Sequence, residues 1–273
     1  FHIQEFPITE DKLKSPRELP YHTFAFASYM PKLNTANPEV RDYLLSVATY
    51  WIENFDIDAW RLDVANEIDH QFWRDFRKAV LAKKPDLYIL GEIWHTSQPW
   101  LQGDEFHAVM NYPLSESIKD YFLRQRKKTE QFISEINSQS MYYKQQISEV
   151  MFNLLDSHDT ERILTTAKGN IQHVKAALTF LYLQKGTPCI YYGTELALIG
   201  GPDPDCRRVM PWDRVSEDND MLNFMKKLIK VRKEVASIIQ HGNYRLEEVE
   251  PDVIALRWNY QGKEVQAIFN HSS

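Results

Sequence analysis

Short apolar segments alternate with helical segments through most of the chain. Asn37 is a typical N-cap, Pro38 is a typical first helical residue, and apolar residues then recur at helical spacing as far as Trp51. Strands that alternate with helices in this way form parallel βαβ units. The sequence therefore predicts an α/β fold, with strands at 57–64, 87–90, 108–112, 151–155 and 189–192 and helices that begin near residues 37, 72, 113, 129, 171 and 218.

The pattern changes after Gly242. Short runs of alternating polarity at 244–246 and 253–258 are separated by turn residues, which is typical of antiparallel hairpins. We therefore expect three segments: an irregular loop over 1–30, the parallel α/β part over 31–240, and the start of a C-terminal antiparallel β-sandwich domain over 241–273.

Charge and cysteine content exclude several classes of protein. The chain has 32 Lys and Arg against 38 Asp and Glu, a net charge of −6, which argues against nucleic acid or an anionic membrane as the main partner. Cys189 and Cys206 do not form a CxxC or His/Cys pattern, so neither a disulfide framework nor a zinc site is expected. The many aromatic residues favour a partner with flat apolar faces, such as a sugar.

Three acidic residues follow three of the predicted strands: Asp63, Glu92 and Asp159. Ligand sites of parallel sheets lie at the carboxyl ends of the strands. Arg61 precedes Asp63 by two residues and therefore shares its face of the strand, where a guanidinium would keep that carboxylate ionised and oriented. Any one of these acids could equally be a solvated residue or a helix cap, but three successive ones favour a functional site.

Glu92 is followed by Ile93 and Trp94, apolar neighbours that would favour a protonated carboxyl. An ionised carboxylate that faces a protonated carboxyl group is the catalytic pair of glycoside hydrolases. His158 and Asp159 would add a hydrogen-bond donor and a negative charge, which suit a sugar hydroxyl and an oxocarbenium-like transition state.

The segments that carry these residues resemble short sequence regions of the α-amylase family. They are DAWRLDVANE at 58–67, GEIWH at 91–95 and LDSHDT at 155–160. A further segment, MPKLN at 30–34, resembles the region that marks the neopullulanase, cyclomaltodextrinase and maltogenic amylase branch. The order and spacing of these motifs make the resemblance highly specific.

This resemblance implies a (β/α)₈ TIM barrel that cleaves α-glucosidic bonds with retention of configuration. Asp63 would be the nucleophile, Glu92 the general acid/base and Asp159 the transition-state stabiliser, with Arg61 and His158 in support. Retention predicts carboxyl groups of Asp63 and Glu92 about 5–5.5 Å apart. The substrates would be maltooligosaccharides, cyclodextrins or pullulan, cut at α-1,4 and also α-1,6 bonds, with transglycosylation as a competing reaction.

The resemblance also implies further substrate-binding residues. Trp94 would line the acceptor side, the alternative being an aromatic that only packs at the barrel mouth. Asn111 and Tyr112 would contribute on the same side, although a core role for Tyr112 is an equal alternative. Asp203 and Arg207 would bind glucose on the donor side, and an internal ion pair between them is compatible with that role. His107 stands where relatives often have Asp, which bears on local hydrogen bonding only.

One family region, an Asp with a nearby Asn-His pair after the third barrel strand, is missing from the sequence. We therefore expect an incomplete barrel, about strands four to eight, with residues 1–30 as the remnant of the domain inserted after strand three. Calcium ligands would lie in the missing half, and the residues present require no cofactor or metal. The resemblance further implies a cytoplasmic parent protein that dimerises through a missing N-terminal domain.

We expect the chain by itself to be inactive, because an open barrel exposes sheet edges. The alternative from another class is a non-catalytic glycan-binding or interaction protein on an amylase-like barrel. Such relatives tend to lose the acid triad, whereas Asp63, Glu92 and Asp159 are all present here.

Overall fold

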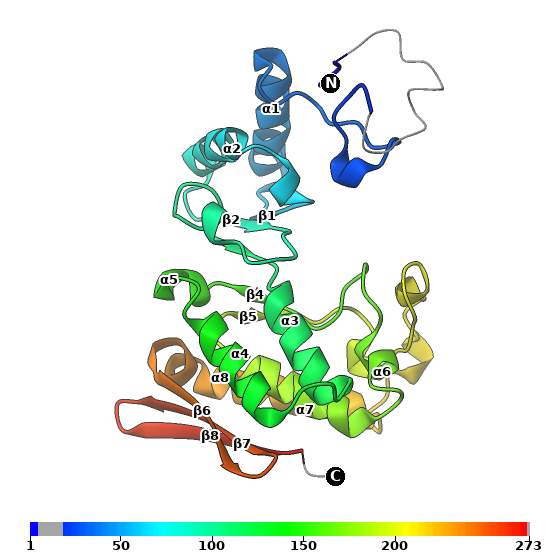
Figure 1. The fold of residues 1–273 in the computed structure, drawn as a ribbon, viewed down its shortest axis with the longest axis vertical. Coiled ribbons are helices and arrows are strands. Elements are labelled where there is room, and N and C mark those ends of the chain that lie inside the picture. Colours follow the sequence, from blue (N-terminus) through cyan, green and yellow to red (C-terminus); the bar gives the residue numbers. More distant parts are fainter. Residues whose placement is uncertain (5–18, 272–273) are drawn as a thin grey trace. The chain divides into compact units, whose positions relative to one another are not determined.

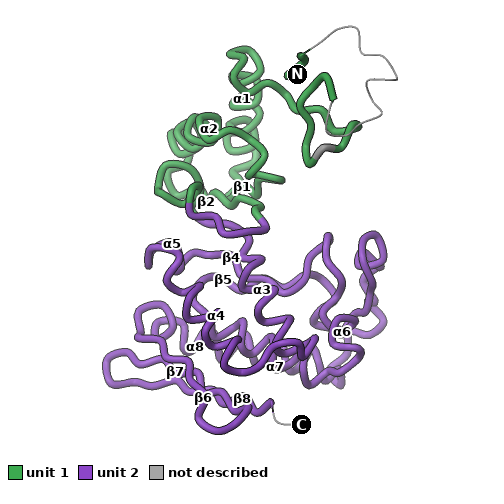
Figure 2. Tube along the Cα trace, in the orientation of Figure 1, with its two compact units in different colours: residues 1–93, 99–107 green, residues 94–98, 108–273 purple. Residues whose placement is uncertain are grey.

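The computed structural model describes residues 1–4 and 19–271, so part of the predicted loop over 1–30 lies outside the described residues. The chain divides into two compact units (Figure 2). Unit 1 comprises residues 1–93 and 99–107, and unit 2 comprises residues 94–98 and 108–273. The proposed domain limits at 30/31 and 240/241 remain a prediction.

Unit 1 contains the first two parallel strands and their helices (Figure 1). Helix α1, Pro38–Phe55, begins where the sequence predicts, because the Asn37 side chain accepts hydrogen bonds from the first turn. Strand β1, Ala59–Leu62, is followed by α2, His70–Lys83, and by β2, Tyr88–Gly91. The two strands pair in parallel, as expected. Residues 1–4 and 19–31 add two antiparallel bridges, Ile3 with Tyr21 and Thr23 with Pro31.

Aromatic side chains fill the core of unit 1. Phe72, Trp73 and Phe76 of α2 are buried, and Trp73 meets Phe106 edge to face. The ring of Phe106 also explains why residue 91 is glycine, since a Cβ on Gly91 would lie 2.7 Å from this ring. Only glycine lets the end of β2 approach the aromatic core this closely.

One face of α1 is exposed although it is apolar. Tyr43, Tyr50, Trp51 and Phe55 are all exposed, and the ring centroids of Trp51 and Phe55 are 5.0 Å apart. The buried residues of α1 are instead Ala48 and Ile52. The helical spacing is as predicted, but the larger apolar side chains lie on the solvent-exposed side of the described structure.

Unit 2 continues the alternation of strands and helices (Figure 1). Met110, directly after β3, bridges Phe152 of β4 in parallel, and β4 pairs in parallel with β5. Short 3₁₀ turns fill the segments between the larger elements. The elements are β3 Ala108–Val109, α3 Tyr112–Ile118 with a π-helical continuation Lys119–Leu123, α4 Thr129–Ser140, α5 Gln145–Ser148, β4 Phe152–Asn153, α6 Ile163–Thr166, α7 Ile171–Tyr182, β5 Thr187–Pro188, α8 Asp220–His241, β6 Asn243–Glu250, β7 Val253–Tyr260 and β8 Lys263–Asn270.

Two predicted strand limits in unit 2 are wrong. Tyr112 belongs to α3 and not to a strand, because the Asn111 side chain caps the helix through the Leu114 N–H and Pro113 fits its first turn. The strand predicted at 189–192 lies earlier, at Thr187–Pro188, because only this part faces the two residues of β4. The amide of Cys189 still donates to the carbonyl of Asn153, at 2.7 Å, and pairing ends there.

The C-terminal segment forms the predicted antiparallel hairpins, with β7 between β6 and β8. Trp258 of β7 is buried, and its indole N–H donates to the carbonyl of Leu183 at the end of α7. Phe269 of β8 packs on Phe122 and Phe180, so the sheet shares one core with the helices of unit 2. None of the helices in the described part of the chain has the length and apolar character needed to span a bilayer.

Candidate active site

The three acids predicted from the sequence all follow strands. Asp63 comes directly after β1 and Glu92 directly after β2, both in unit 1. Asp159 lies in the segment between β4 and α6 of unit 2. The two groups are therefore described separately.

The register of β1 and β2 aligns Asp63 with Glu92. Arg61 pairs with Leu90 and Leu62 pairs with Gly91, so the two acids occupy the next positions of their strands. Because side chains alternate along a strand, Arg61, Asp63 and Glu92 emerge on the same face. The backbone continues the pairing, since the Glu92 N–H donates to the Leu62 carbonyl at 2.8 Å.

Arg61 connects the two carboxylates through one guanidinium. Its Nη1 forms an ion pair with Oδ1 of Asp63, as the sequence predicts, and its Nη2 lies 2.8 Å from Oε1 of Glu92. The second contact is not evident from the sequence, because it depends on the register between strands. Asp63 is 72% exposed whereas Glu92 is only 5% exposed, so the two carboxylates differ sharply in access to solvent.

The backbone after Asp63 also holds Glu92. The N–H of Val64 donates to Oε2 of Glu92 at 2.9 Å. Val64 adopts φ 45° and ψ 44°, a left-handed conformation that is unfavourable for a β-branched residue. Glu92 is thus buried, as expected, but its carboxylate contacts a guanidinium and a backbone amide in place of the purely apolar surroundings that Ile93 and Trp94 suggested.

Asp159 in unit 2 lies between two basic side chains. Its Oδ2 is 3.1 Å from Nε2 of His158 and its Oδ1 is 3.2 Å from Nη2 of Arg207. Arg207 also pairs with Asp203 at 2.5 Å, which is the internal ion pair that the sequence allows. Desolvation lowers the pKa of Arg207, but the ion pairs with Asp203 and Asp159 outweigh it and hold this pKa above its usual range. Asp159, His158, Asp203 and Arg207 therefore form one cluster.

The predicted acceptor-side aromatics stack on one another. The rings of Trp94 and Tyr112 are nearly parallel, with centroids 3.9 Å apart. Tyr112 is buried at 2% exposure whereas Trp94 is 48% exposed, so of these two rings only that of Trp94 is accessible to solvent. Asn111 caps α3, and its Nδ2 donates to Asn153 at 2.9 Å. Tyr112 thus has the core role that the sequence left open.

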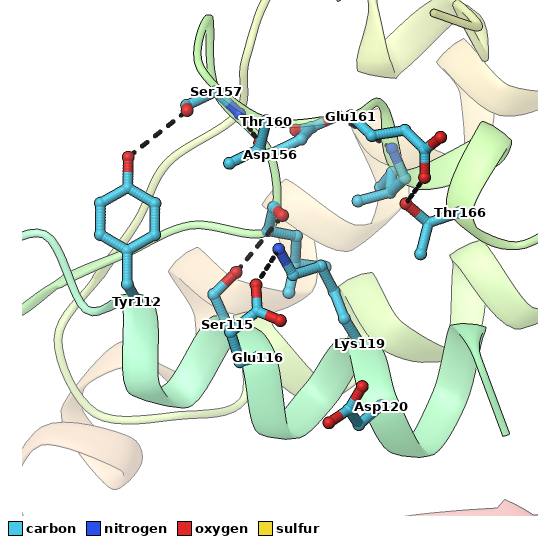
Figure 3. A network of polar contacts seen from close by, with 12 residues as sticks. Tyr112, Ser115, Glu116, Lys119, Asp120, Asp156, Ser157, Thr160, Glu161 and Thr166 are labelled. Carbon is cyan, nitrogen blue, oxygen red and sulfur yellow. Dashed lines mark hydrogen bonds and ion pairs between the residues drawn. The ribbon is translucent and has the colours of Figure 1, made fainter. Parts of the chain in front are cut away.

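A buried polar network supports the Asp159 segment (Figure 3). The Tyr112 hydroxyl lies 3.4 Å from Oγ of Ser157, and this oxygen accepts the Asp159 N–H at 3.2 Å. Asp156 accepts hydrogen bonds from the Thr194 hydroxyl and the Ile163 N–H. Burial raises the pKa of Asp156 to about 6, although these hydrogen bonds oppose the effect.

Arg162 is a site-supporting residue that the sequence analysis missed. It is fully buried, its Nε donates to the carbonyl of Cys206 at 2.8 Å, and its Nη1 donates to the carbonyl of Tyr192. Its guanidinium also stacks 3.9 Å from the centroid of the Tyr191 ring. Arg162 thereby joins the segments that carry Asp159 and Arg207. Its position two residues after the LDSHDT segment was the available signal.

His107, which stands where relatives often have Asp, accepts a hydrogen bond from the backbone. Nδ1 of His107 accepts the N–H of Ile89 at 3.0 Å, and its ring stacks on Tyr88. Burial and the nearby charge of Arg77 lower the pKa of His107 to about 4, so the imidazole is a neutral acceptor. Within residues 1–4 and 19–271, no group of three or more His, Cys, Asp or Glu residues could hold a metal ion.

Comparison with known proteins places the chain in a family of barrel proteins. The model of the α-amylase catalytic domain matches residues 16–230, and the chain belongs to this family. Its fold is accordingly that of the α-amylase catalytic domain, a TIM-barrel type, as the motifs predict.

Its relatives carry the names of the branch that the motifs indicate. The chain is 48% identical to the intracellular maltogenic amylase of Bacillus subtilis (strain 168) over 275 residues, which cover 100% of this chain and 45% of the relative. It is 51% identical over 238 residues to the cyclomaltodextrinase of Geobacillus thermopakistaniensis (strain MAS1), covering 87% of the chain and 40% of the relative. The chain thus spans less than half the length of these relatives.

Solved structures agree with this assignment. A cyclomaltodextrinase structure superposes with a TM-score of 0.90 at 45% identity, covering 99% of this chain and 46% of that one. The cyclic α-maltosyl-(1→6)-maltose hydrolase of Arthrobacter globiformis, in its ligand-free form, superposes with a TM-score of 0.89 at 34% identity, over 99% of this chain and 60% of that one.

Proposed function

We propose that this chain is the C-terminal part of the catalytic domain of a retaining glycosidase. The substrates are α-glucans with α-1,4 bonds, namely maltooligosaccharides and cyclodextrins, and α-1,6 bonds as in pullulan are a further target. Family membership supports the reaction class, and the names of the relatives support the substrates.

The observation that carries this proposal is the guanidinium of Arg61 between an exposed Asp63 and a buried Glu92. In the proposed reaction Asp63 attacks the anomeric carbon while Glu92 transfers its proton to the glycosidic oxygen, so the bond to the leaving sugar breaks as the glycosyl-enzyme bond forms. Glu92 then removes a proton from water, which attacks the anomeric carbon and releases Asp63. Arg61 contacts both carboxyl groups and holds them on one face.

Asp159 is proposed to stabilise the positive charge that develops on the sugar ring, with His158 and Arg207 fixing its two oxygens. Asp203 and Arg207 remain partly exposed in their ion pair, so both are able to bind donor-side hydroxyl groups. On the acceptor side, Trp94 offers an exposed ring, backed by Tyr112, on which a sugar can stack. A bound sugar acceptor there would compete with water, which is the basis for proposed transglycosylation.

We further propose that the barrel is completed by a polypeptide outside this chain. The exposed aromatic face of α1 supports this, because Tyr43, Trp51 and Phe55 form an apolar surface that a neighbouring barrel helix would cover. Dimerisation through an additional domain and a cytoplasmic location are proposed for the whole protein, the latter from the name of the B. subtilis relative. The 273-residue chain alone should hydrolyse no maltoside.

The Asp63→Asn variant of the complete protein tests the reaction. It should lose hydrolysis of a chromogenic maltoside by at least about 10⁴-fold, since amide nitrogen and oxygen cannot form the glycosyl ester. Asp58→Asn is the matched control, because Asp58 lies at the other end of β1, is 94% exposed and pairs only with Lys84 among the ion pairs of the described residues. Retained activity in Asp63→Asn would refute the nucleophile, and glycan binding without any hydrolysis by the unmodified protein would favour a non-catalytic binder.

A further inference from the structure

A cavity of about 490 Å³ lies in unit 2, apart from the Asp159 cluster. Its walls come from the end of α4, from the segment around α5, and from the start of β6 with Trp258 of β7. Met151 and Lys185, which precede β4 and β5, also line it, whereas Asp159 follows β4. Asn111 is the one residue with a proposed role in the reaction that also borders this cavity. Its volume is within the usual range for small-molecule sites.

The wall of this cavity combines polar and apolar side chains and is nearly uncharged. Six amide side chains line it, and no Asp or Glu of the described residues does, although the chain has 38 acidic residues. A metal cation would therefore find no carboxylate ligand here. The ammonium of Lys185 lies 5.7 Å from the centroid of the Trp258 ring, so this cation already has an aromatic partner. The lining amides are Asn111, Asn137, Gln139, Gln145, Gln184 and Asn243.

Two lining groups are buried and have no hydrogen-bond partner among the described residues. The amide nitrogen of Gln139 donates to Oγ of Ser117 at 2.9 Å and to the carbonyl of Pro113 at 3.4 Å, which fixes the orientation of the amide. Its Oε1 is left as a buried acceptor without a donor. The hydroxyl of Tyr244 is also buried, and the nearby Gln184 side chain does not meet it in hydrogen-bond geometry. Buried polar groups of this kind are normally satisfied by a bound molecule or water.

We propose that this cavity is a second, non-catalytic binding site for a neutral saccharide. Hydroxyl groups of a sugar both donate and accept, so they match the free Gln139 oxygen and the surrounding amides. Tyr142, which is 39% exposed and lines the cavity, offers an aromatic face to the apolar side of a sugar ring. The site does not use Asp63 or Glu92, so its existence is independent of the proposed hydrolysis.

Nuclear magnetic resonance of the 273-residue chain tests this site, with maltotriose as the probe. Saturable shifts are expected at the side-chain amide of Gln139 and the indole N–H of Trp258. The Trp94 indole separately reports binding at the proposed reaction site, so the two sites are distinguished in one titration. Inorganic phosphate serves as the charged probe, and shifts at Gln139 with phosphate but not with maltotriose would overturn the proposal.

Two variants of α4 provide a matched pair. Ser140→Trp places a large side chain at a residue that lines the cavity. The affinity for maltotriose, measured from the shifts at Gln139, should fall by about tenfold or more. Ser138→Trp adds the same side chain at an exposed residue of the same helix that does not line the cavity, and should leave them unchanged. Gln139→Ala, read at the Trp258 indole, should also weaken binding. Unchanged maltotriose affinity in Ser140→Trp would refute the site. If Ser140→Trp does not fold, unchanged affinity in Gln139→Ala would refute it.

Discussion

The backbone N–H of Val64, in a left-handed conformation at φ 45°, donates a 2.9 Å hydrogen bond to Oε2 of Glu92. The residue after the proposed nucleophile therefore positions the proposed acid/base, while Arg61 contacts both carboxylates. The unfavourable conformation of Val64 costs about 1–3 kcal/mol and persists only where the surrounding contacts enforce it. Asp63 and Glu92, two groups of the proposed reaction, are thus connected through Arg61 and Val64 within unit 1.

Arg61→Lys should impair the reaction of the complete protein more than the same substitution at a surface arginine does. Lysine keeps the charge but cannot bridge Asp63 and Glu92 in the planar geometry of a guanidinium. We expect kcat/KM for a chromogenic maltoside to fall by about 10²–10³-fold. Arg41→Lys is the control, because Arg41 forms an exposed pair with Asp42. Equal activity in the two variants would contradict the bridging role.

His107→Gln should change how stability depends on pH. The pKa of His107 falls from 6.5 to about 4 on folding, mainly through burial, so the unfolded chain binds more protons between these values. The contribution of His107 to stability is therefore complete above pH 6.5 and is lost as the pH falls towards 4. Urea unfolding at several pH values should show that wild type loses stability relative to His107→Gln as the pH falls from 6.5 to 4. A constant difference would contradict this prediction.

Asp156→Asn should reveal the opposite trend. Burial raises the pKa of Asp156 from 3.8 to about 6, so the folded chain binds more protons between these values. Its contribution is complete below about pH 4 and is lost as the pH rises through 6, by up to roughly 3 kcal/mol. Measured against Asp156→Asn by urea unfolding, wild type should lose relative stability between pH 4 and 6. An increase in that window would show that the carboxyl is ionised when folded.

Trp94→Ala should reduce transfer to sugar acceptors more than hydrolysis in the complete protein. The variant removes the exposed ring that stacks on Tyr112. A lost aromatic contact of about 0.5–1.5 kcal/mol corresponds to a two- to tenfold lower ratio of transfer to hydrolysis products. Tyr112→Phe retains the stacked ring and should keep the ratio, as product analysis with added glucose would measure. An unchanged ratio in Trp94→Ala would remove Trp94 from the acceptor site.

Arg162→Met should destabilise unit 2 strongly. The variant leaves the carbonyls of Cys206 and Tyr192 without their buried donor, at a cost of about 2–5 kcal/mol. Arg208→Met, which breaks a half-exposed pair with Asp205, should cost less than about 1 kcal/mol. Urea unfolding of both variants compares them directly. Similar losses would mean that Arg162 does not join the segments that carry Asp159 and Arg207.

Several elements of the fold are readable from local sequence. Asn37 and Pro38 mark the start of α1, the change in polarity after Gly242 marks the antiparallel hairpins, and the acids after the strands mark the proposed site. These signals work because caps, turns and side-chain periodicity act between residues close in the chain. Where local signals compete, they fail, as at Tyr112, which the cap formed by Asn111 places in a helix.

The sequence by itself determined the α/β alternation, the family resemblance and the identity of Asp63, Glu92 and Asp159 as candidate acids. Only the tertiary structure decided that Arg61 serves two carboxylates, that Val64 holds Glu92, and that Arg162 connects the segments around Asp159. The physical reason is distance along the chain: Val64 and Glu92 are 28 residues apart, and Arg162 and Cys206 are 44 apart. Contacts of that kind depend on strand register and loop packing, which no local pattern encodes.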